Sequence, residues 1–95
     1  MCDDMFEWDR HNLRKIRAHG IRREEVQQSL ANDPILVHEQ DVEGEIRFVY
    51  YAESDARRLL AVIVTTREEL IRVVTAYDLA PAQRRDYFAR RAEGE

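Results

Sequence analysis

Residues 59–64 read Leu-Leu-Ala-Val-Ile-Val, an unbroken apolar run that is rich in branched side chains. A short run of this kind between polar turns is typical of a strand buried on both faces of a sheet. The next apolar segments outward, at 46–51 and 70–77, alternate with a period of two, and 35–39 is a further short strand. The sequence therefore predicts four strands, with 59–64 as a central one.

The segments between these strands are short and polar. We expect turns at 40–45, 53–55 and 66–69, and such short connections favour an antiparallel meander. Alternation also assigns each strand residue to one of two faces. It places Ile46, Phe48 and Tyr50 opposite Arg47, Val49 and Tyr51, and it places Leu70, Arg72, Val74 and Ala76 opposite Ile71, Val73, Thr75 and Tyr77.

Helix signals lie before the four strands in the chain. Asp9 is a good N-cap for a helix that continues to His19 and ends at Gly20, after a weak edge strand at 5–8. A second, brief helix follows and stops at 32–34, which read Asn-Asp-Pro. Two helices therefore precede the sheet.

A final helix follows the last strand. Pro81 opens this helix at its first position, and we expect Tyr87 and Phe88 to dock it on the sheet. The element order is then βααββββα, an α+β fold with an antiparallel twisted sheet packed by two N-terminal helices and one C-terminal helix. With 95 residues and 44% hydrophobic content, the chain is expected to form a single domain over residues 1–95.

Composition excludes several classes of protein. No apolar run approaches the roughly 20 residues that a membrane-spanning helix needs, and the acidic segment 1–4 has no apolar core of a secretory signal behind it. We therefore expect a cytoplasmic protein with no membrane contact. Cys2 is the only cysteine, which excludes an intramolecular disulfide. His11, His19 and His38 lack metal-ligand spacing and no glycine-rich phosphate loop occurs, so we expect no metal and no cofactor.

The charges are segregated along the chain. The formal net charge is -4, yet 14 of the 15 basic residues are arginine. Residues 10–23 carry six basic residues and no acid, 84–91 hold four arginines, and the segments 1–9 and 39–45 hold four acids each. Arginine grips phosphate through two parallel hydrogen bonds and stacks on bases, which favours nucleic-acid contact. Composition alone is explained equally well by solvated helix faces.

Several motifs follow one another along the chain. They are Phe6-Glu7-Trp8-Asp9, His19-Gly20-Ile21, Glu24-Glu25-Val26, Asn32-Asp33-Pro34, Arg72-Val73-Val74-Thr75-Ala76 and Gln83-Arg84-Arg85-Asp86-Tyr87. In this order and spacing the motifs resemble the BrnT family of toxins from bacterial type II toxin–antitoxin pairs, small proteins with a RelE-like ribonuclease fold. The resemblance implies an RNA-cutting toxin that slows translation. It also implies a partner antitoxin, encoded by a neighbouring gene and carrying a ribbon-helix-helix DNA-binding part.

Two segments depart from the family pattern. The family commonly ends its last strand with Ser-Ala-Arg, whereas this chain has Thr75-Ala76-Tyr77, so a tyrosine replaces an arginine at the mouth of the site. At the start of the closing helix, Ala80 and Gln83 replace the Thr or Ser and the Glu of a capping box. The tyrosine and the net charge of -4 favour an alternative, a non-catalytic protein- or RNA-binding module that keeps the toxin fold.

The resemblance implies metal-independent cleavage, which needs a base near the RNA 2′-hydroxyl, cations at the phosphorane and an acid for the leaving oxygen. The catalytic candidates are Arg72, Arg84, Tyr87 and Tyr77, and the candidates for RNA binding are Arg47, Arg85, Arg14, Lys15 and His19. Either tyrosine could transfer a proton or stack on a base. Histidine suits proton transfer near neutral pH, although a histidine beside a C-cap glycine commonly serves the helix end instead.

Overall fold

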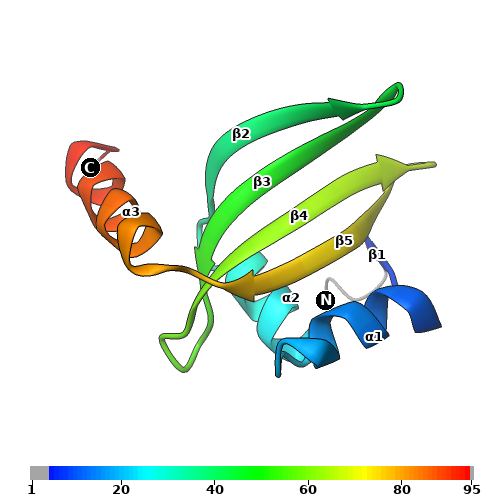
Figure 1. Cartoon of the computed structure of the whole chain (residues 1–95), viewed down its shortest axis with the longest axis horizontal. Helices are drawn as coiled ribbons and strands as arrows, with labels where there is room; N and C mark the ends of the chain where they lie inside the picture. The colour runs from blue at the N-terminus through cyan, green and yellow to red at the C-terminus, as the bar shows by residue number, and fades with distance from the viewer. Residues whose placement is uncertain (1–4, 95) are drawn as a thin grey trace.

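The computed structural model describes residues 5–94, and within them it contains three helices and five strands (Figure 1). Met1–Asp4 and Glu95 lie outside the described residues, and with them Cys2 and two acids of the N-terminal group. The order βααββββα predicted from the sequence is confirmed. The elements are β1 (Phe6–Glu7), α1 (Arg10–Ala18), α2 (Arg23–Ala31), β2 (Ile35–Val42), β3 (Glu45–Glu53), β4 (Leu59–Arg67), β5 (Leu70–Asp78) and α3 (Pro81–Gly94).

The strands form one sheet in the order β1-β5-β4-β3-β2. From β2 to β5 each strand pairs with the next in antiparallel direction, as the short connections predicted. β1 pairs with β5 in parallel, so the sheet is mixed, and the expectation of an antiparallel sheet holds for β2 to β5 only. Both helices and three strands separate β1 from β5 in the chain, so no hairpin turn imposes opposite directions on them.

The β2–β3 hairpin is longer than the sequence indicated. A turn was expected over 40–45, but β2 continues to Val42 and β3 begins at Glu45. Only Glu43 and Gly44 form the turn, and both have left-handed backbones, with φ of 54° and 90°. This geometry matches the twist of the flanking strands and suits a two-residue hairpin. The acids of this segment therefore lie mainly on the strands of a long hairpin.

A β-bulge at Val74 changes the faces of β5. Ile63 pairs with Thr75, while the next residue, Val64, pairs with Val73, so the register skips Val74. The strict alternation predicted for 70–77 is therefore wrong, because the bulge inserts one residue that the hydrophobic period does not reveal. The face that packs against the first two helices carries Ile71, Val73 and Ala76, and the opposite face carries Arg72, Thr75 and Tyr77.

α1 and α2 pack on one face of the sheet (Figure 1). Asp9 caps α1 as predicted, since its Oδ1 accepts a hydrogen bond of 2.8 Å from the backbone N–H of Asn12. The helices and the strands share a buried apolar cluster, in which β4 supplies Leu60, Val62 and Val64. The prediction that β4 is a central, largely buried strand is therefore confirmed.

α3 lies at one end of the sheet and contacts the other face (Figure 1). Tyr87 is 2% exposed and shares a cluster with Tyr51 and Leu59. Phe88 is 57% exposed, so the expectation that both aromatic residues dock the helix is correct for Tyr87 and wrong for Phe88. Adjacent helix residues point about 100° apart, which leaves one of the two rings in water. None of the described helices is long and apolar enough to cross a membrane.

The start of α3 keeps half of the capping box that the sequence comparison suggested was lost. The Gln83 side chain accepts a hydrogen bond of 2.8 Å from the backbone N–H of Ala80, as the glutamate of a capping box would. The alanine still offers no oxygen to the helix N-terminus. Pro81 needs no partner for its backbone nitrogen, which reduces the number of unpaired donors there.

Candidate functional site

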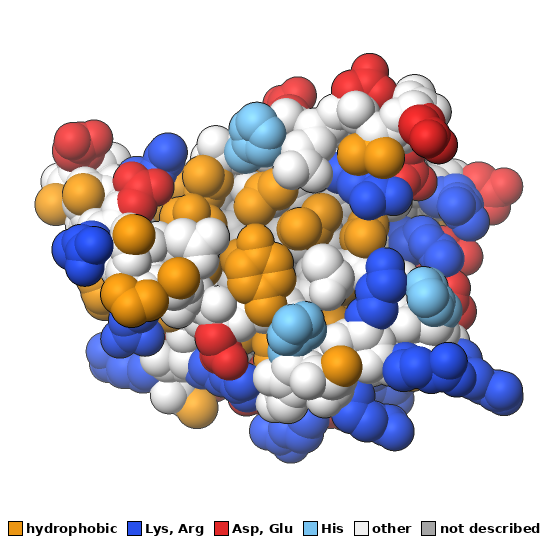
Figure 2. Space-filling model, viewed as in Figure 1, with side chains coloured by type: hydrophobic (Ala, Val, Ile, Leu, Met, Phe, Trp, Pro, Cys, Tyr) orange, Lys and Arg blue, Asp and Glu red, His pale blue; other side chains and the backbone are white. Residues whose placement is uncertain are grey.

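The sheet face opposite α1 and α2, which we call the open face, meets α3 only at one end (Figure 1). Across its middle Val49 pairs with Ile63, and Ile63 pairs with Thr75. Tyr77 lies one row further along β5 and pairs with Ala61. Figure 2 shows apolar side chains in the middle of this face, and Lys and Arg side chains gathered beside it along α1. Such a surface suits single-stranded nucleic acid, whose bases stack on apolar and aromatic groups while its phosphates contact cations.

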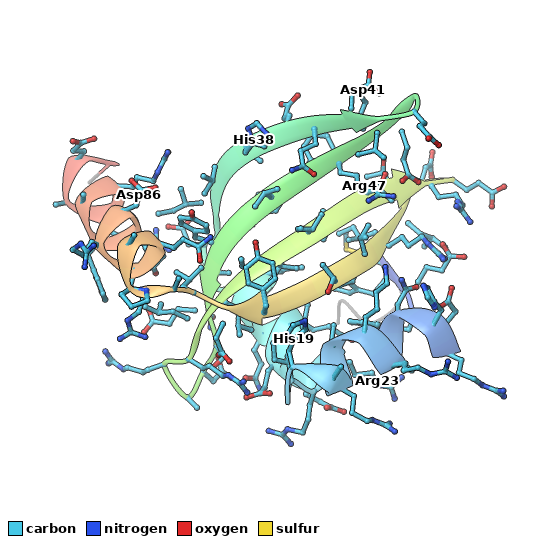
Figure 3. All side chains as sticks on the ribbon, in the orientation of Figure 1. His19, Arg23, His38, Asp41, Arg47 and Asp86 are labelled. Carbon is cyan, nitrogen blue, oxygen red and sulfur yellow. The ribbon has the colours of Figure 1, made fainter. Side chains whose placement is uncertain are left out.

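His19 and Tyr77 meet at the edge of the open face. His19 is the C-cap residue of α1, and Gly20 after it has φ of +71°, which turns the chain away from the helix. The His19 ring lies 6.2 Å from the Tyr77 ring, centroid to centroid, with the planes tilted by 55°. Figure 3 labels His19 at the end of α1. His19 is exposed and Tyr77 is half-buried. The fold thus brings together two side chains of types that can transfer protons, although they lie far apart in the sequence.

Arg58 binds the last carbonyl groups at the end of α1, a role that was expected for His19. Its guanidinium donates to the carbonyl oxygens of Gly20 at 3.0 Å and His19 at 3.4 Å. The same group donates to Asp78 at 2.7 and 2.9 Å and to Glu25 at 3.2 Å. These partners lie at least 20 residues away in the chain, so no local pattern could have found Arg58. The His19 imidazole is left to face the open sheet.

The Arg58 network shifts the pKa of its members. Hydrogen bonds from Arg58 hold the pKa of Asp78 below its ordinary value of 3.8. The pKa of Glu25 lies below 4.5, mainly because the backbone N–H of Arg22 donates to it and then because of Arg58. In turn Asp78, followed by Glu25, raises the pKa of Arg58. The charged network therefore ties α1, α2 and β5 together beside the His19–Tyr77 pair.

Arg72 lies on the open face, but its guanidinium is already paired. Nη2 donates to Oδ2 of Asp9 at 2.8 Å, and Nη1 lies 3.8 Å from Oε1 of Glu7. The pKa of Asp9 is lowered, first by the N–H of Asn12 and then by Arg72. The Arg72 side chain is 20% exposed. Arg72 therefore joins β5 to β1 and to the start of α1, and it presents only part of its cation to the open face.

Arg47 on β3 lies level with Arg72 on β5, on the same face of the sheet. Phe48 pairs with Val64, and the next β4 residue, Thr65, pairs with Arg72. Arg47 and Arg72 therefore flank β4 two strands apart, about 10 Å between their backbones. Nε of Arg47 donates to Oε1 of Glu45 at 2.9 Å, and the arginine side chain is 30% exposed (Figure 3). A row of two arginines at this spacing can contact neighbouring phosphates.

α1 presents cations on two of its sides. Lys15 precedes His19 by four residues and so lies on the same side of the helix. Arg14 lies on a different side of α1 from Lys15 and His19, in a groove that Trp8, Arg10 and Arg17 also line. Within residues 5–94 these four basic side chains of α1 form no ion pair, and all are exposed. The predicted RNA-binding residues Lys15 and Arg14 thus belong to different sides of one basic helix.

The candidates on α3 lie apart from Arg72. The part of β5 between Arg72 and Asp78 is extended and spans about 20 Å, and α3 begins only after it. Arg84 and Arg85 are exposed. The Tyr87 hydroxyl is buried where α3 contacts the sheet. It donates a hydrogen bond of 3.4 Å to a Glu53 carboxylate oxygen and accepts one of 3.1 Å from Nε of Arg91. The structure therefore does not bring Arg84 and Tyr87 to Arg72.

Among the described residues no group of three or more His, Cys, Asp and Glu side chains could hold a metal ion. No curated protein matches the chain. The model of the family described as "Ribonuclease toxin, BrnT, of type II toxin-antitoxin system" matches residues 8–82. The matched part includes His19, Arg72 and Tyr77 and ends at the start of α3, before Arg84. Because this match spans most of the chain, the protein belongs to the BrnT family of ribonuclease toxins, which act in type II toxin–antitoxin systems with an antitoxin as partner.

Proposed function

We propose that this toxin, acting as one domain in the cytoplasm, cleaves RNA on its open face without a metal ion and thereby inhibits translation. An antitoxin encoded by a neighbouring gene would neutralise it. The observation that carries the proposal is the His19–Tyr77 pair beside an apolar sheet face, in a chain that belongs to a ribonuclease family. The basic α1 beside this face supports an RNA substrate.

The proposed reaction is an internal transesterification. His19 accepts the proton of the RNA 2′-hydroxyl, the 2′-oxygen attacks phosphorus, and the bond from phosphorus to the 5′-oxygen breaks. Tyr77 donates its hydroxyl proton to that leaving 5′-oxygen, or it stacks on the base next to the cleaved bond. Base and acid must both reach one phosphate, and ring centroids 6.2 Å apart place the two side chains close enough for one phosphate to contact both.

The cations have separate parts in the proposal. Arg72 would stabilise charge on the phosphorane, held in orientation by Asp9, and Arg47 would contact the next phosphate. Lys15, Arg14, Arg84 and Arg85 would bind RNA outside the cleaved bond. Tyr87 would act only through the seating of α3, because its hydroxyl is buried.

Cleavage of a labelled RNA by the purified protein tests the proposal. We expect cleavage to continue in excess EDTA, and His19→Ala to lower its rate by about 10²–10⁴-fold, the usual contribution of general acid–base catalysis. Tyr77→Phe removes the hydroxyl and keeps the ring, so it separates proton transfer from stacking. His11→Ala is the matched control, an exposed histidine on the same helix. Loss of cleavage in EDTA, or equal rates for His19→Ala and wild type, would contradict the proposal.

A binding module without catalysis is the second candidate. The observation that favours it is the pairing of Arg72 with Asp9, which leaves less of this cation for a phosphate. The second expected arginine is also missing, because Tyr77 occupies its position. Under this alternative the wild-type protein binds RNA but releases no product at micromolar enzyme. Growth arrest on expression, relieved by the neighbouring gene, would support the toxin, and normal growth would support the module.

A further inference from the structure

The face of the sheet that carries α1 and α2 is not fully covered. No helix is drawn behind the far half of the β2–β3 hairpin (Figure 1). The register places Leu36 of β2 and Ile46 and Phe48 of β3 on this side. Leu36 is 44% exposed and Ile46 is 42% exposed. We call these three residues, together with Glu39 and Asp41 of β2, the hairpin surface.

The hairpin surface combines apolar side chains with unneutralised acids. Glu39 pairs with Phe48 in the register and Asp41 pairs with Ile46, so both carboxylates project on the apolar side. Within residues 5–94 neither acid forms an ion pair. Asp41 accepts a hydrogen bond of 2.8 Å from the N–H of Gly44 through one oxygen only (Figure 3). The surface therefore attracts a partner that supplies both apolar groups and positive charge.

The outer edge of β2 is also free, because β2 is the last strand of the sheet. A free edge presents backbone N–H and C=O groups that can pair with an added strand. The negative charges of Glu39 and Asp41 determine which kind of strand can be added here. A second copy of β2 would bring Glu39 and Asp41 against their own counterparts, which like-charge repulsion disfavours. RNA phosphates are repelled in the same way.

We propose that the antitoxin docks on the hairpin surface through an extended segment added as a strand to the edge of β2. Because Leu36, Glu39 and Asp41 lie on one face of the sheet, apolar residues and Lys or Arg share the corresponding face of this segment. This inference rests on the family's antitoxin partner, not on the chemistry proposed for the open face. The apolar residues of the segment cover Leu36 and Ile46, and its cations contact Glu39 and Asp41. The antitoxin thereby holds a surface separate from the His19–Tyr77 pair.

The first test uses as probe a synthetic octapeptide, Lys-Thr-Val-Thr-Lys-Thr-Val-Thr, whose Lys and Val side chains lie on one face of a strand. We call it the Lys-Val peptide; the Glu-Val peptide has Glu in place of Lys. Binding is followed by amide chemical shifts of the intact protein. Shift changes are expected at 36–42 and at Ile46. The double variant Glu39→Gln/Asp41→Asn should weaken binding about tenfold, since each exposed ion pair contributes a few-fold. Asparagine keeps the acceptor for Gly44. The Glu-Val peptide should leave the spectrum unchanged.

The matched control removes the same charge elsewhere. Glu68→Gln/Glu69→Gln lies in the turn between β4 and β5 and should bind the Lys-Val peptide as wild type does. Equal weakening in both double variants would show attraction to total charge and would overturn the proposal. Shift changes confined to the open face, or pairing of the protein with itself through β2, would overturn it as well.

The second test is made in cells with the product of the neighbouring gene. Glu39→Lys should arrest growth and cleave RNA as wild type does, yet should no longer be rescued by that product. Rescue equal to wild type would overturn the docking surface, and so would a wild type that the neighbouring gene fails to rescue. RNA cleavage is measured on each purified protein, so failure of the proposed chemistry is seen independently of failure of docking.

Discussion

Arg58 shows how one side chain can hold together the elements around a candidate site. It contacts the last carbonyls of α1, Glu25 in the first turn of α2 and Asp78 at the end of β5. The guanidinium fork suits this task because it offers five donors in one plane. The elements that carry His19 and Tyr77 are thus held by a cation that sequence reasoning did not single out. Nothing in the local pattern around residue 58 distinguishes it from Arg57.

Replacement of Arg58 tests this view at the level of a single residue. Arg58→Gln should lower the free energy of unfolding by about 1–2 kcal/mol at pH 7, since it removes charge-assisted bonds that are partly exposed. The pKa of Asp78 and the pKa of Glu25 are lowered in the folded state, so their stabilisation is present above 3.8 and 4.5 and is lost as pH falls below these values. Urea unfolding at pH 7 and pH 3 should therefore show a difference between the proteins that shrinks in acid.

Arg57→Gln is the control for this experiment. Arg57 is the preceding residue and is exposed, and we expect its replacement to leave the unfolding free energy unchanged at both pH values. A difference between wild type and Arg58→Gln that stays constant from pH 7 to pH 3 would mean that the carboxylates of Asp78 and Glu25 do not carry the effect.

At the scale of elements, α3 is attached differently from the other helices. The guanidinium of Arg91 lies 5.2 Å from the centre of the Tyr87 ring and also binds Asp33, before β2. The pKa of Arg91 is raised by the hydrogen bond to Tyr87 and then by Asp33. The family match ends where α3 starts. Tyr87 thus packs α3 against the sheet, and Arg91 links the helix to the segment before β2.

Removal of the tyrosine should release α3. In Tyr87→Ala we expect the amides of α3 to exchange with solvent much faster, and the unfolding free energy to fall by about 3 kcal/mol, as for other buried aromatic residues. Hydrogen exchange and urea unfolding measure the two effects. Phe88→Ala, on the same helix but exposed, should change stability by less than about 0.5 kcal/mol. Protected α3 amides in Tyr87→Ala would contradict the account.

The elements also show what a sequence can and cannot reveal. The hydrophobic period and the helix-capping residues predicted βααββββα correctly. Asp9, Gly20 and Pro81 act on the backbone next to them, and the short apolar run at 59–64 fits a buried strand. The bulge at Val74 and the tight turn at Glu43 were missed, since a bulge depends on the partner strand and acidic residues can lie in strand or loop. For the candidate site, Tyr77 and His19 were predicted singly, but their contact depends on tertiary packing between α1 and β5.

At the scale of the whole molecule, the net charge of -4 hides two opposite regions. The basic helix α1 lies along one side of the open face, and acids gather toward the tip of the β2–β3 hairpin (Figure 2). A polyanion therefore meets attraction on one side and repulsion on the other. We therefore expect the position of the charges, and not their total, to decide where RNA binds and where a cationic protein segment binds.

The salt dependence of RNA binding tests whether position decides. For a single strand that cannot be cleaved, made with 2′-O-methyl nucleotides, each phosphate contact contributes about 0.7 to the slope of log affinity against log salt concentration. Arg14→Gln/Lys15→Gln should reduce that slope by about 1.4 if both side chains contact phosphates. Arg57→Gln/Arg90→Gln is the control, because it removes the same charge from the loop before β4 and from α3, where Arg90 is already paired with Asp86. Equal slopes for the two double variants would show that RNA responds only to total charge, and the assignment of α1 as an RNA contact would then be wrong.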